Sequence, residues 1–131
     1  MRAFLDTNVV VRYFTRDPPE QADAAERFLR DAEELWVADL IVAEVVYVLR
    51  RVYRIPRPVV ASGLRSMLGV RNIVTNNPAL LLRAIEIYET RRLAFADAYI
   101  AAAAEMSGAG TVASFDKGLD RLGTVKRVEP A

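Results

Sequence analysis

Apolar residues along the chain recur with two different spacings, which together predict alternating strands and helices. Short apolar runs, such as residues 2–5 and 35–38, fit buried strands because they are too brief for stable helices. Longer stretches carry apolar residues three or four positions apart, as Ala22, Ala25 and Phe28 do, and this spacing is typical of one helix face. Proline, glycine and asparagine separate the stretches and indicate where helices begin and end.

The expected elements cover most of the chain. Strands are predicted at residues 2–5, 35–38, 72–75, 111–114 and 125–128, and helices at residues 8–14, 20–32, 40–53, 59–68, 78–91, 95–106 and 117–122. Asp39 is expected to cap the helix at residues 40–53. Alternating strands and helices predict a parallel sheet flanked by helices. No internal repeat or low-complexity linker interrupts the pattern, so a single domain over residues 1–131 is expected.

Composition removes several kinds of chemistry. The chain has 131 residues without cysteine or histidine, which excludes disulfides, thiolate chemistry, a Ser-His-Asp triad and imidazole metal sites. Catalysis would depend on carboxylates, hydroxyls, lysine or a metal held by oxygen ligands. No apolar run reaches the roughly 18 residues of a membrane helix. No segment has the pattern of a signal peptide, and a cytoplasmic location without membrane attachment is expected.

Four acidic residues stand in apolar surroundings. Asp6 ends the first predicted strand and Asp116 follows the strand at residues 111–114, whereas Glu44 and Asp97 have apolar residues three and four positions away on both sides. A buried carboxylate is costly unless it is paired, hydrogen-bonded or bound to a metal. Each acid also has an ordinary explanation: Asp6 and Asp116 could cap the helices that follow them. Glu44 and Asp97 could pair with buried arginines.

The predicted topology favours one shared site for these acids. The carboxyl ends of parallel strands lie at one edge of a sheet, so Asp6 and Asp116 are expected there. Glu44 and Asp97 are expected in the first turns of helices that start at or near that edge. Acids gathered in one place have raised pKa values or bind a cation, and a set of oxygen ligands favours Mg²⁺ or Mn²⁺ over zinc. Phosphodiester hydrolysis or phosphoryl transfer is the natural chemistry of such a site.

At these residues the chain resembles the PIN-domain ribonucleases, most closely the toxin half of VapBC-type toxin–antitoxin pairs. The resemblance rests on Asp6-Thr7-Asn8 after the first strand, Glu44 in V-A-E-V-V, Asp97 in F-A-D-A-Y and Asp116 in A-S-F-D-K. It extends over essentially the whole chain. The D-T-N motif alone is common, whereas all four acids in this order make a specific combination.

The resemblance implies a three-layer α/β/α sandwich with a central, mostly parallel sheet. It implies Mg²⁺- or Mn²⁺-dependent cleavage of RNA, usually by a homodimer, and a small cognate antitoxin that blocks the site. By the same resemblance, Asp6, Glu44, Asp97 and Asp116 are catalytic metal ligands, with Asp6 and Asp97 the most dependable. Thr7, Asn8 and Ser114 would support the ligands or position the substrate, although these residue types also suit helix caps and turns.

Several assignments stay open at this stage. Asp120 could extend the acidic cluster or lie on a solvated face. The arginines at positions 50, 51, 54 and 57 could contact RNA phosphates, an antitoxin or solvent only. Two other functions are a catalytically idle PIN-like module that binds RNA or protein, and a different Mg²⁺ phosphoesterase. The complete set of four acids counts against the first, and the absence of a D-x-D motif after the first strand counts against the second.

Overall fold

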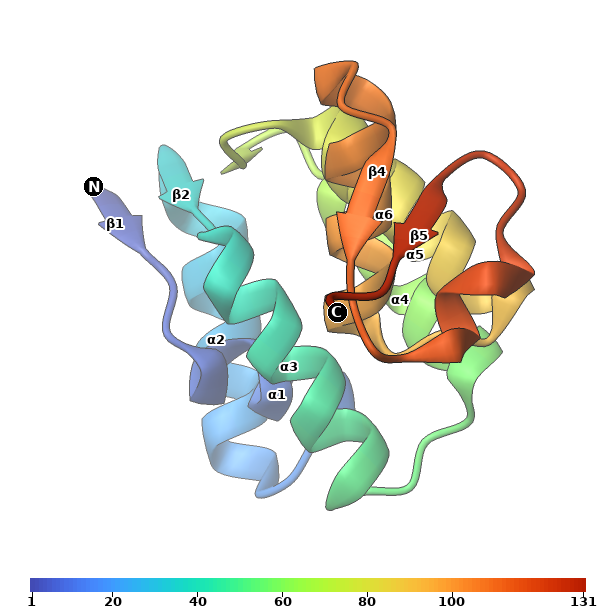
Figure 1. Ribbon diagram of the computed structural model, residues 1–131. Helices are drawn as coiled ribbons and strands as arrows, with labels where there is room; N and C mark the ends of the chain where they lie inside the picture. Colours follow the sequence, from blue (N-terminus) through green and yellow to red (C-terminus); the bar gives the residue numbers. More distant parts are fainter. The chain divides into compact units, whose positions relative to one another are not determined.

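Pairs of helices separate the first four strands in the computed structural model, which describes residues 1–131 (Figure 1). The chain separates into two compact units, residues 1–76 and residues 77–131. Every strand pair in either unit is parallel. The predicted α/β class with parallel strands is therefore confirmed.

The first unit contains a three-stranded sheet in the order β1-β2-β3. Its strands are β1 (Arg2–Phe4), β2 (Glu34–Trp36) and β3 (Ile73–Val74). Leu35 of β2 pairs with Ala3 on one side and Ile73 on the other, and it is fully buried. The Leu5 N–H donates to the Trp36 carbonyl at 2.8 Å, so the sheet holds the chain up to the residue before Asp6.

Four helices complete the first unit. They are α1 (Thr7–Thr15), α2 (Pro19–Asp31), α3 (Asp39–Arg51) and α4 (Arg57–Leu68). Helix α1 packs against both α2 and α3, and it contributes Val10 and Val11 to the core. The start of α1, which carries the D-T-N motif, therefore lies in an element that is anchored by apolar contacts.

The start of α3 differs in detail from the sequence prediction. Ala38, not Asp39, occupies the N-cap position, and Asp39 is the first helical residue. A carboxylate in the first turn is still favourable there because it faces the positive end of the helix dipole. The boundary shift leaves the helix itself as expected.

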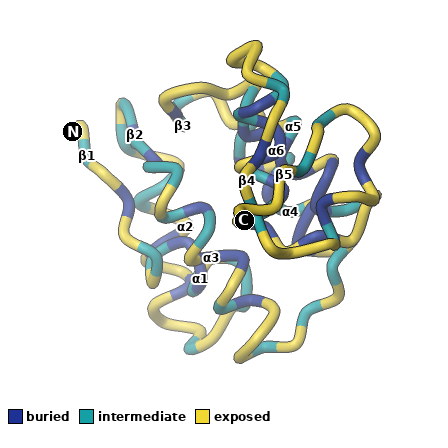
Figure 2. Tube along the Cα trace, viewed as in Figure 1, coloured by how far each residue is buried: buried dark blue, intermediate teal, exposed yellow.

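The second unit begins with two helices that pack along each other, α5 (Pro78–Arg91) and α6 (Phe95–Ser107). The Asn77 side chain caps α5 by accepting from the Leu80 N–H at 3.2 Å. Buried and exposed positions both occur along α6 (Figure 2). Alanines form most of its buried face, and their small size allows a helix to approach closely. Helix α6 ends at Gly108, whose φ of 82° is a left-handed conformation that glycine adopts without strain.

A two-stranded parallel sheet follows in the same unit. Strand β4 (Thr111–Ala113) pairs with β5 (Lys126–Val128), and the 3₁₀ helix η1 (Lys117–Arg121) lies between them in sequence. Every predicted strand and helix is present, with ends within about two residues of the expected ones. The short helix predicted at residues 117–122 is the only element of a different type, because η1 is a 3₁₀ helix. This geometry is common in helices of a few residues. None of the helices combines the length and apolar character needed to cross a membrane.

Candidate active site

Asp6 connects the first strand to the first helix. It occupies the N-cap position of α1, where its Oδ1 accepts a hydrogen bond from the Thr7 N–H at 2.8 Å. The capping explanation for Asp6 is thus confirmed. Capping engages one carboxylate oxygen, and an ionised carboxylate has further acceptor capacity for a second role.

A hydrogen bond from Thr7 to Glu44 joins α1 to α3. The Thr7 hydroxyl donates to Glu44 Oε2 at 2.8 Å, across 37 positions of sequence. A hollow of about 400 Å³ opens beside this bond. Its lining includes Asp6, Thr7, Asn8, Arg12, Glu44 and Tyr53. Carboxylate, hydroxyl and amide oxygens therefore share one hollow in the first unit.

Three of the four acids are less buried than the sequence predicts. Asp6, Glu44 and Asp116 are exposed, and only Asp97 is half-buried. The expectation of burial was wrong for Asp6 and Asp116 because both stand at the starts of helices, where caps lie at the surface.

The expectation for Glu44 was wrong for a different reason. The buried face of α3 consists of Val42, Val45, Val46 and Leu49. Leu40 and Tyr47, which flank Glu44 at helical spacing, are 76% and 61% exposed. Helix α3 is apolar on most sides, so residue spacing alone could not identify its buried face. Glu44 also lies in the second turn of α3 rather than the first.

Asp97 and Asp116 form a pair of like charges in the second unit. Asp97 lies in the first turn of α6, and Asp116 caps η1 after β4. The pKa of Asp97 is raised, first because burial disfavours its charged form and then because Asp116 repels it. A hydrogen bond with Asp116 acts in the same direction. The raised pKa expected for clustered acids is therefore found at Asp97.

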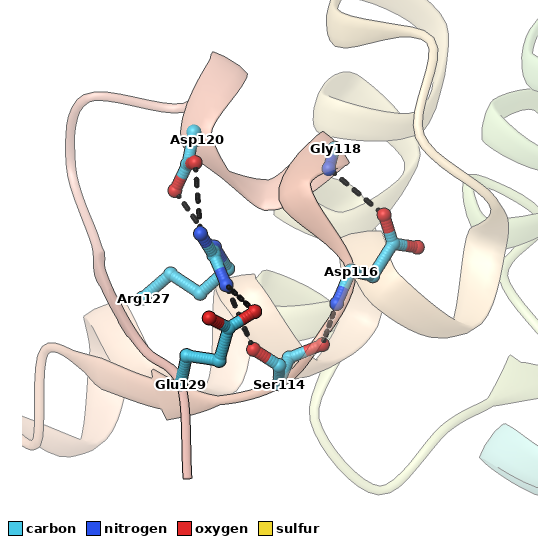
Figure 3. Close-up of polar contacts among 6 residues, drawn as sticks. All are labelled: Ser114, Asp116, Gly118, Asp120, Arg127 and Glu129. Atoms are coloured by element: carbon cyan, nitrogen blue, oxygen red, sulfur yellow. Dashed lines mark hydrogen bonds and ion pairs between the residues drawn. The ribbon is translucent and has the colours of Figure 1, made fainter. Parts of the chain in front are cut away.

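Two local hydrogen bonds hold the turn that carries Asp116 (Figure 3). The Asp116 N–H donates to the Ser114 hydroxyl at 2.9 Å, and the Gly118 N–H donates to Asp116 Oδ1 at 2.8 Å. The capping explanation for Asp116 is thus confirmed as well. Ser114 contacts the backbone of Asp116, as a group that supports this acid would do.

Asp120 does not extend the acidic pair. Its Oδ1 and Oδ2 accept from Arg127 Nε at 2.9 Å and from Arg127 Nη2 at 3.2 Å (Figure 3). The hydrogen bond with Arg127 lowers the pKa of Asp120. Asp120 is exposed, as expected for a solvated face, and its charge is balanced by an ion pair with Arg127, so it does not belong to the acidic pair.

The predicted site residues therefore meet in two sets. The first unit brings together Asp6, Thr7, Asn8 and Glu44, and the second brings together Asp97, Ser114 and Asp116. Neither Glu44 nor Asp97 pairs with a buried arginine; their partners are Thr7 and Asp116. No group of three or more acids within either unit is close enough to hold a metal ion. The oxygen donors and the repulsion at Asp97 nonetheless fit a hard cation such as Mg²⁺ or Mn²⁺.

Two arginines beside these sets were missed by the sequence prediction. Arg12 lines the hollow in the first unit, and its Nε donates to Gln21 Oε1 at 2.7 Å. Arg12 lies four residues after Asn8, and this spacing places both residues on one helix face. The spacing could therefore have indicated that Arg12 lies near the predicted site. Arg127 had no such signal, because its contacts depend on the pairing of β4 with β5.

A larger hollow of the first unit lies away from the predicted acids. It measures about 770 Å³ and is lined by residues of α1, α2, α4 and β3, many of them apolar. None of the four predicted acids borders it. Cavity size therefore does not identify the catalytic region of this chain, and the placement of acids is the better guide.

Comparison with known families identifies the chain. A family model for the PIN domain matches residues 3–125. The chain belongs to the PIN domain family. The matched span includes all seven predicted site residues. No curated protein matches the sequence significantly. One similar solved structure is the crystal structure of VapBC2 from Rickettsia felis bound to a DNA fragment from their promoter, with 17% identity, a TM-score of 0.39 and complete coverage of both chains.

Membership in this family bears directly on activity. PIN domains are generally nucleases, and they typically use divalent metal ions. The match therefore supports hydrolase activity for this PIN domain. It also agrees with the predicted fold class, since PIN domains are helix-rich α/β proteins with parallel strands.

Proposed function

We propose that this PIN domain is a Mg²⁺- or Mn²⁺-dependent endoribonuclease that hydrolyses RNA phosphodiester bonds. The observation that carries the proposal is the Asp97–Asp116 pair, in a chain whose family consists generally of nucleases. The two carboxyl groups are close enough to raise the pKa of Asp97, and a bound cation would relieve their repulsion. Oxygen donors favour Mg²⁺ or Mn²⁺ among the biological metals.

Asp6 and Glu44 of the first unit and Asp97 and Asp116 of the second are proposed as the acids that hold the metal. The family match runs through both units, which supports a single catalytic domain over residues 1–131. When bound, the metal would activate water and neutralise charge on the attacking and leaving oxygens.

The neighbouring residues orient these acids and the substrate. Thr7 fixes the direction of the Glu44 carboxylate through its hydroxyl, and Ser114 fixes the backbone of Asp116. Asn8 lines the same hollow as Glu44 and offers both a donor and an acceptor to RNA. Arg12 supplies a positive group at that hollow for an RNA phosphate, since Gln21 engages only its Nε.

The proposal also assigns the chain a more specific role, as the toxin of a type II toxin–antitoxin pair. A type II toxin of this kind would be inhibited by a small antitoxin, act in the cytoplasm and assemble as a homodimer. These features rest on the sequence resemblance of the four acid motifs. Production of the chain in cells, with and without a candidate antitoxin from an adjacent reading frame, would test them by growth arrest and its relief.

Removal of divalent metal is expected to stop RNA cleavage. The purified chain should cut a mixed-sequence RNA panel in Mg²⁺ or Mn²⁺ and lose this activity in EDTA, because the proposed metal both activates water and neutralises charge on the attacking and leaving oxygens. Denaturing gels of end-labelled RNA would measure the rate, and re-addition of Mn²⁺ should restore it.

A different result would favour the alternative. Tight RNA binding that is indifferent to EDTA, without cleavage in any metal, would indicate an idle PIN-like module. Hydrolysis of small phosphomonoesters without any cutting of RNA would indicate a different phosphoesterase.

Thr7→Val is expected to lower the cleavage rate about tenfold, since supporting groups of metal ligands typically contribute on this scale. The substitution removes the hydroxyl that donates to Glu44 and keeps the side-chain shape. Thr7→Ser retains the hydroxyl and is the matched control. Initial rates and thermal unfolding should be measured together. Equal rates for Thr7→Val and the wild type would contradict the role of Thr7.

A further inference from the structure

We propose that Arg127 is a positioning residue for Asp116, because one guanidinium group ties together both ends of the turn that carries this acid. The inference rests on the proposed function, since it assigns Arg127 a part in the same reaction. It concerns contacts within the second unit only. Arg127 lies in β5, outside every motif that the sequence suggested.

The contacts of Arg127 reach both sides of Asp116 (Figure 3). On the strand side, Arg127 Nη1 donates to the Ser114 carbonyl at 3.0 Å. On the helix side, its Nε and Nη2 donate to the two carboxylate oxygens of Asp120. The Arg127 side chain is only 12% exposed, so the group is held in place and largely shielded from water.

Asp116 is thus held between two anchored points. Ser114, before it, accepts from the Asp116 N–H and is also held through its own N–H, which donates to the Val128 carbonyl at 3.0 Å. Gly118, after it, donates to Asp116 Oδ1, and the η1 turn that contains Gly118 is anchored at Asp120. Loss of Arg127 would remove the group that joins Ser114 to Asp120 across this turn, and the position of the Asp116 carboxylate would become less defined.

The geometry requires arginine rather than any cation. A guanidinium presents five N–H donors in a planar fork, so it can serve a carboxylate and a carbonyl in the same plane. A lysine ammonium offers one compact charge and cannot span both partners. Asp120 and Glu129 also balance the charge of Arg127, at 2.9 Å and 3.5 Å. This balance disfavours Arg127 as a direct ligand of RNA phosphate.

The first arm of the test examines positioning without metal or RNA. Amide exchange rates of Asp116 and Gly118 would be measured by NMR in the wild type and in Arg127→Lys. Exchange at these amides is expected to rise several-fold in Arg127→Lys, because the anchored turn opens more often. Arg83→Lys is the matched control, since Arg83 makes the same kind of two-point contact with Glu105 elsewhere in the unit. It should leave both amides unchanged.

The second arm measures steady-state RNA cleavage by the same variants. Arg127→Lys is expected to lower kcat about tenfold with KM nearly unchanged, since a small displacement of a catalytic group has effects of this order or larger. Asp120→Asn keeps the Ser114 contact and should lower kcat less. Arg83→Lys should keep wild-type kcat at temperatures where it is folded.

The outcomes separate this inference from the proposed function. Wild-type exchange rates at both amides in Arg127→Lys would overturn the positioning role. Faster exchange with an unchanged kcat would overturn its link to catalysis. If the wild type cuts no RNA in any metal, the proposed function fails and the catalytic link fails with it, while the exchange comparison still decides whether Arg127 holds the turn.

Discussion

Asp97→Asn is expected to abolish RNA cleavage, by a factor on the order of a thousand, while leaving the folded protein at least as stable as the wild type. Asparagine keeps the shape of the side chain and removes the charge proposed to hold the metal. The expectation that Asp97→Asn is at least as stable as the wild type follows from the raised pKa of Asp97. Protonation of Asp97 favours the folded state at low pH, and this gain is lost as the pH rises through the folded pKa. At neutral pH the substitution removes an unfavourable charge.

The measurements are cleavage rates in Mn²⁺ beside thermal unfolding at neutral pH. Asp31→Asn is a suitable control, because Asp31 is 69% exposed and pairs with its neighbour Arg30 outside the predicted site. It should keep the wild-type cleavage rate. Normal cleavage by Asp97→Asn would contradict the proposed role of Asp97, and a strongly lowered unfolding temperature would contradict the stability argument.

Arg83→Met is expected to destabilise the protein by about 2 kcal/mol, since hydrogen bonds to charged groups have roughly this net value. Arg83 of α5 donates from Nε and Nη2 to the two carboxylate oxygens of Glu105 in α6, at 2.7 and 2.9 Å. The two side chains are 27% and 16% exposed, so solvent screens the pair only partly. The substitution would leave Glu105 with the Thr124 hydroxyl as its remaining hydrogen-bond donor.

The same ion pair predicts a pH dependence. The hydrogen bond with Arg83 is the main reason why the pKa of Glu105 lies below its ordinary value of 4.5. A lowered folded pKa means that the stabilisation is present above the ordinary value and is lost as the pH falls through the folded one. The stability difference between the wild type and Arg83→Met should therefore shrink as the pH falls below about 4.5.

Denaturant titrations at pH 7 and at pH 3 would measure both effects. Arg30→Met is the matched control, because the Arg30–Asp31 pair is exposed on both sides and should contribute little. Equal losses of stability in Arg83→Met and Arg30→Met would show that the Arg83–Glu105 ion pair contributes no more to stability than an exposed ion pair. A loss that is independent of pH would assign the effect to packing of the arginine stem.

The alternation of elements and the identity of the acids could be predicted from local sequence. Proline at the start of α5 and glycine at the end of α6 act through the backbone of one or two residues, so their effects are local. Caps at Asp6 and Asp116 are likewise short-range, and both were foreseen as explanations for these acids. The exposure of Glu44 could not be predicted, because α3 has apolar residues on most of its surface and only packing selects the buried side.

By itself, the sequence determined the α/β class, the oxygen-only chemistry and the four acids whose order resembles that of PIN-domain ribonucleases. Tertiary structure alone decided which side chains meet. Thr7 reaches Glu44 because α1 packs against α3, and Arg127 reaches Ser114 and Asp120 because β5 pairs with β4. Such contacts join residues that are distant in sequence, and their energies depend on long-range packing that no local periodicity records.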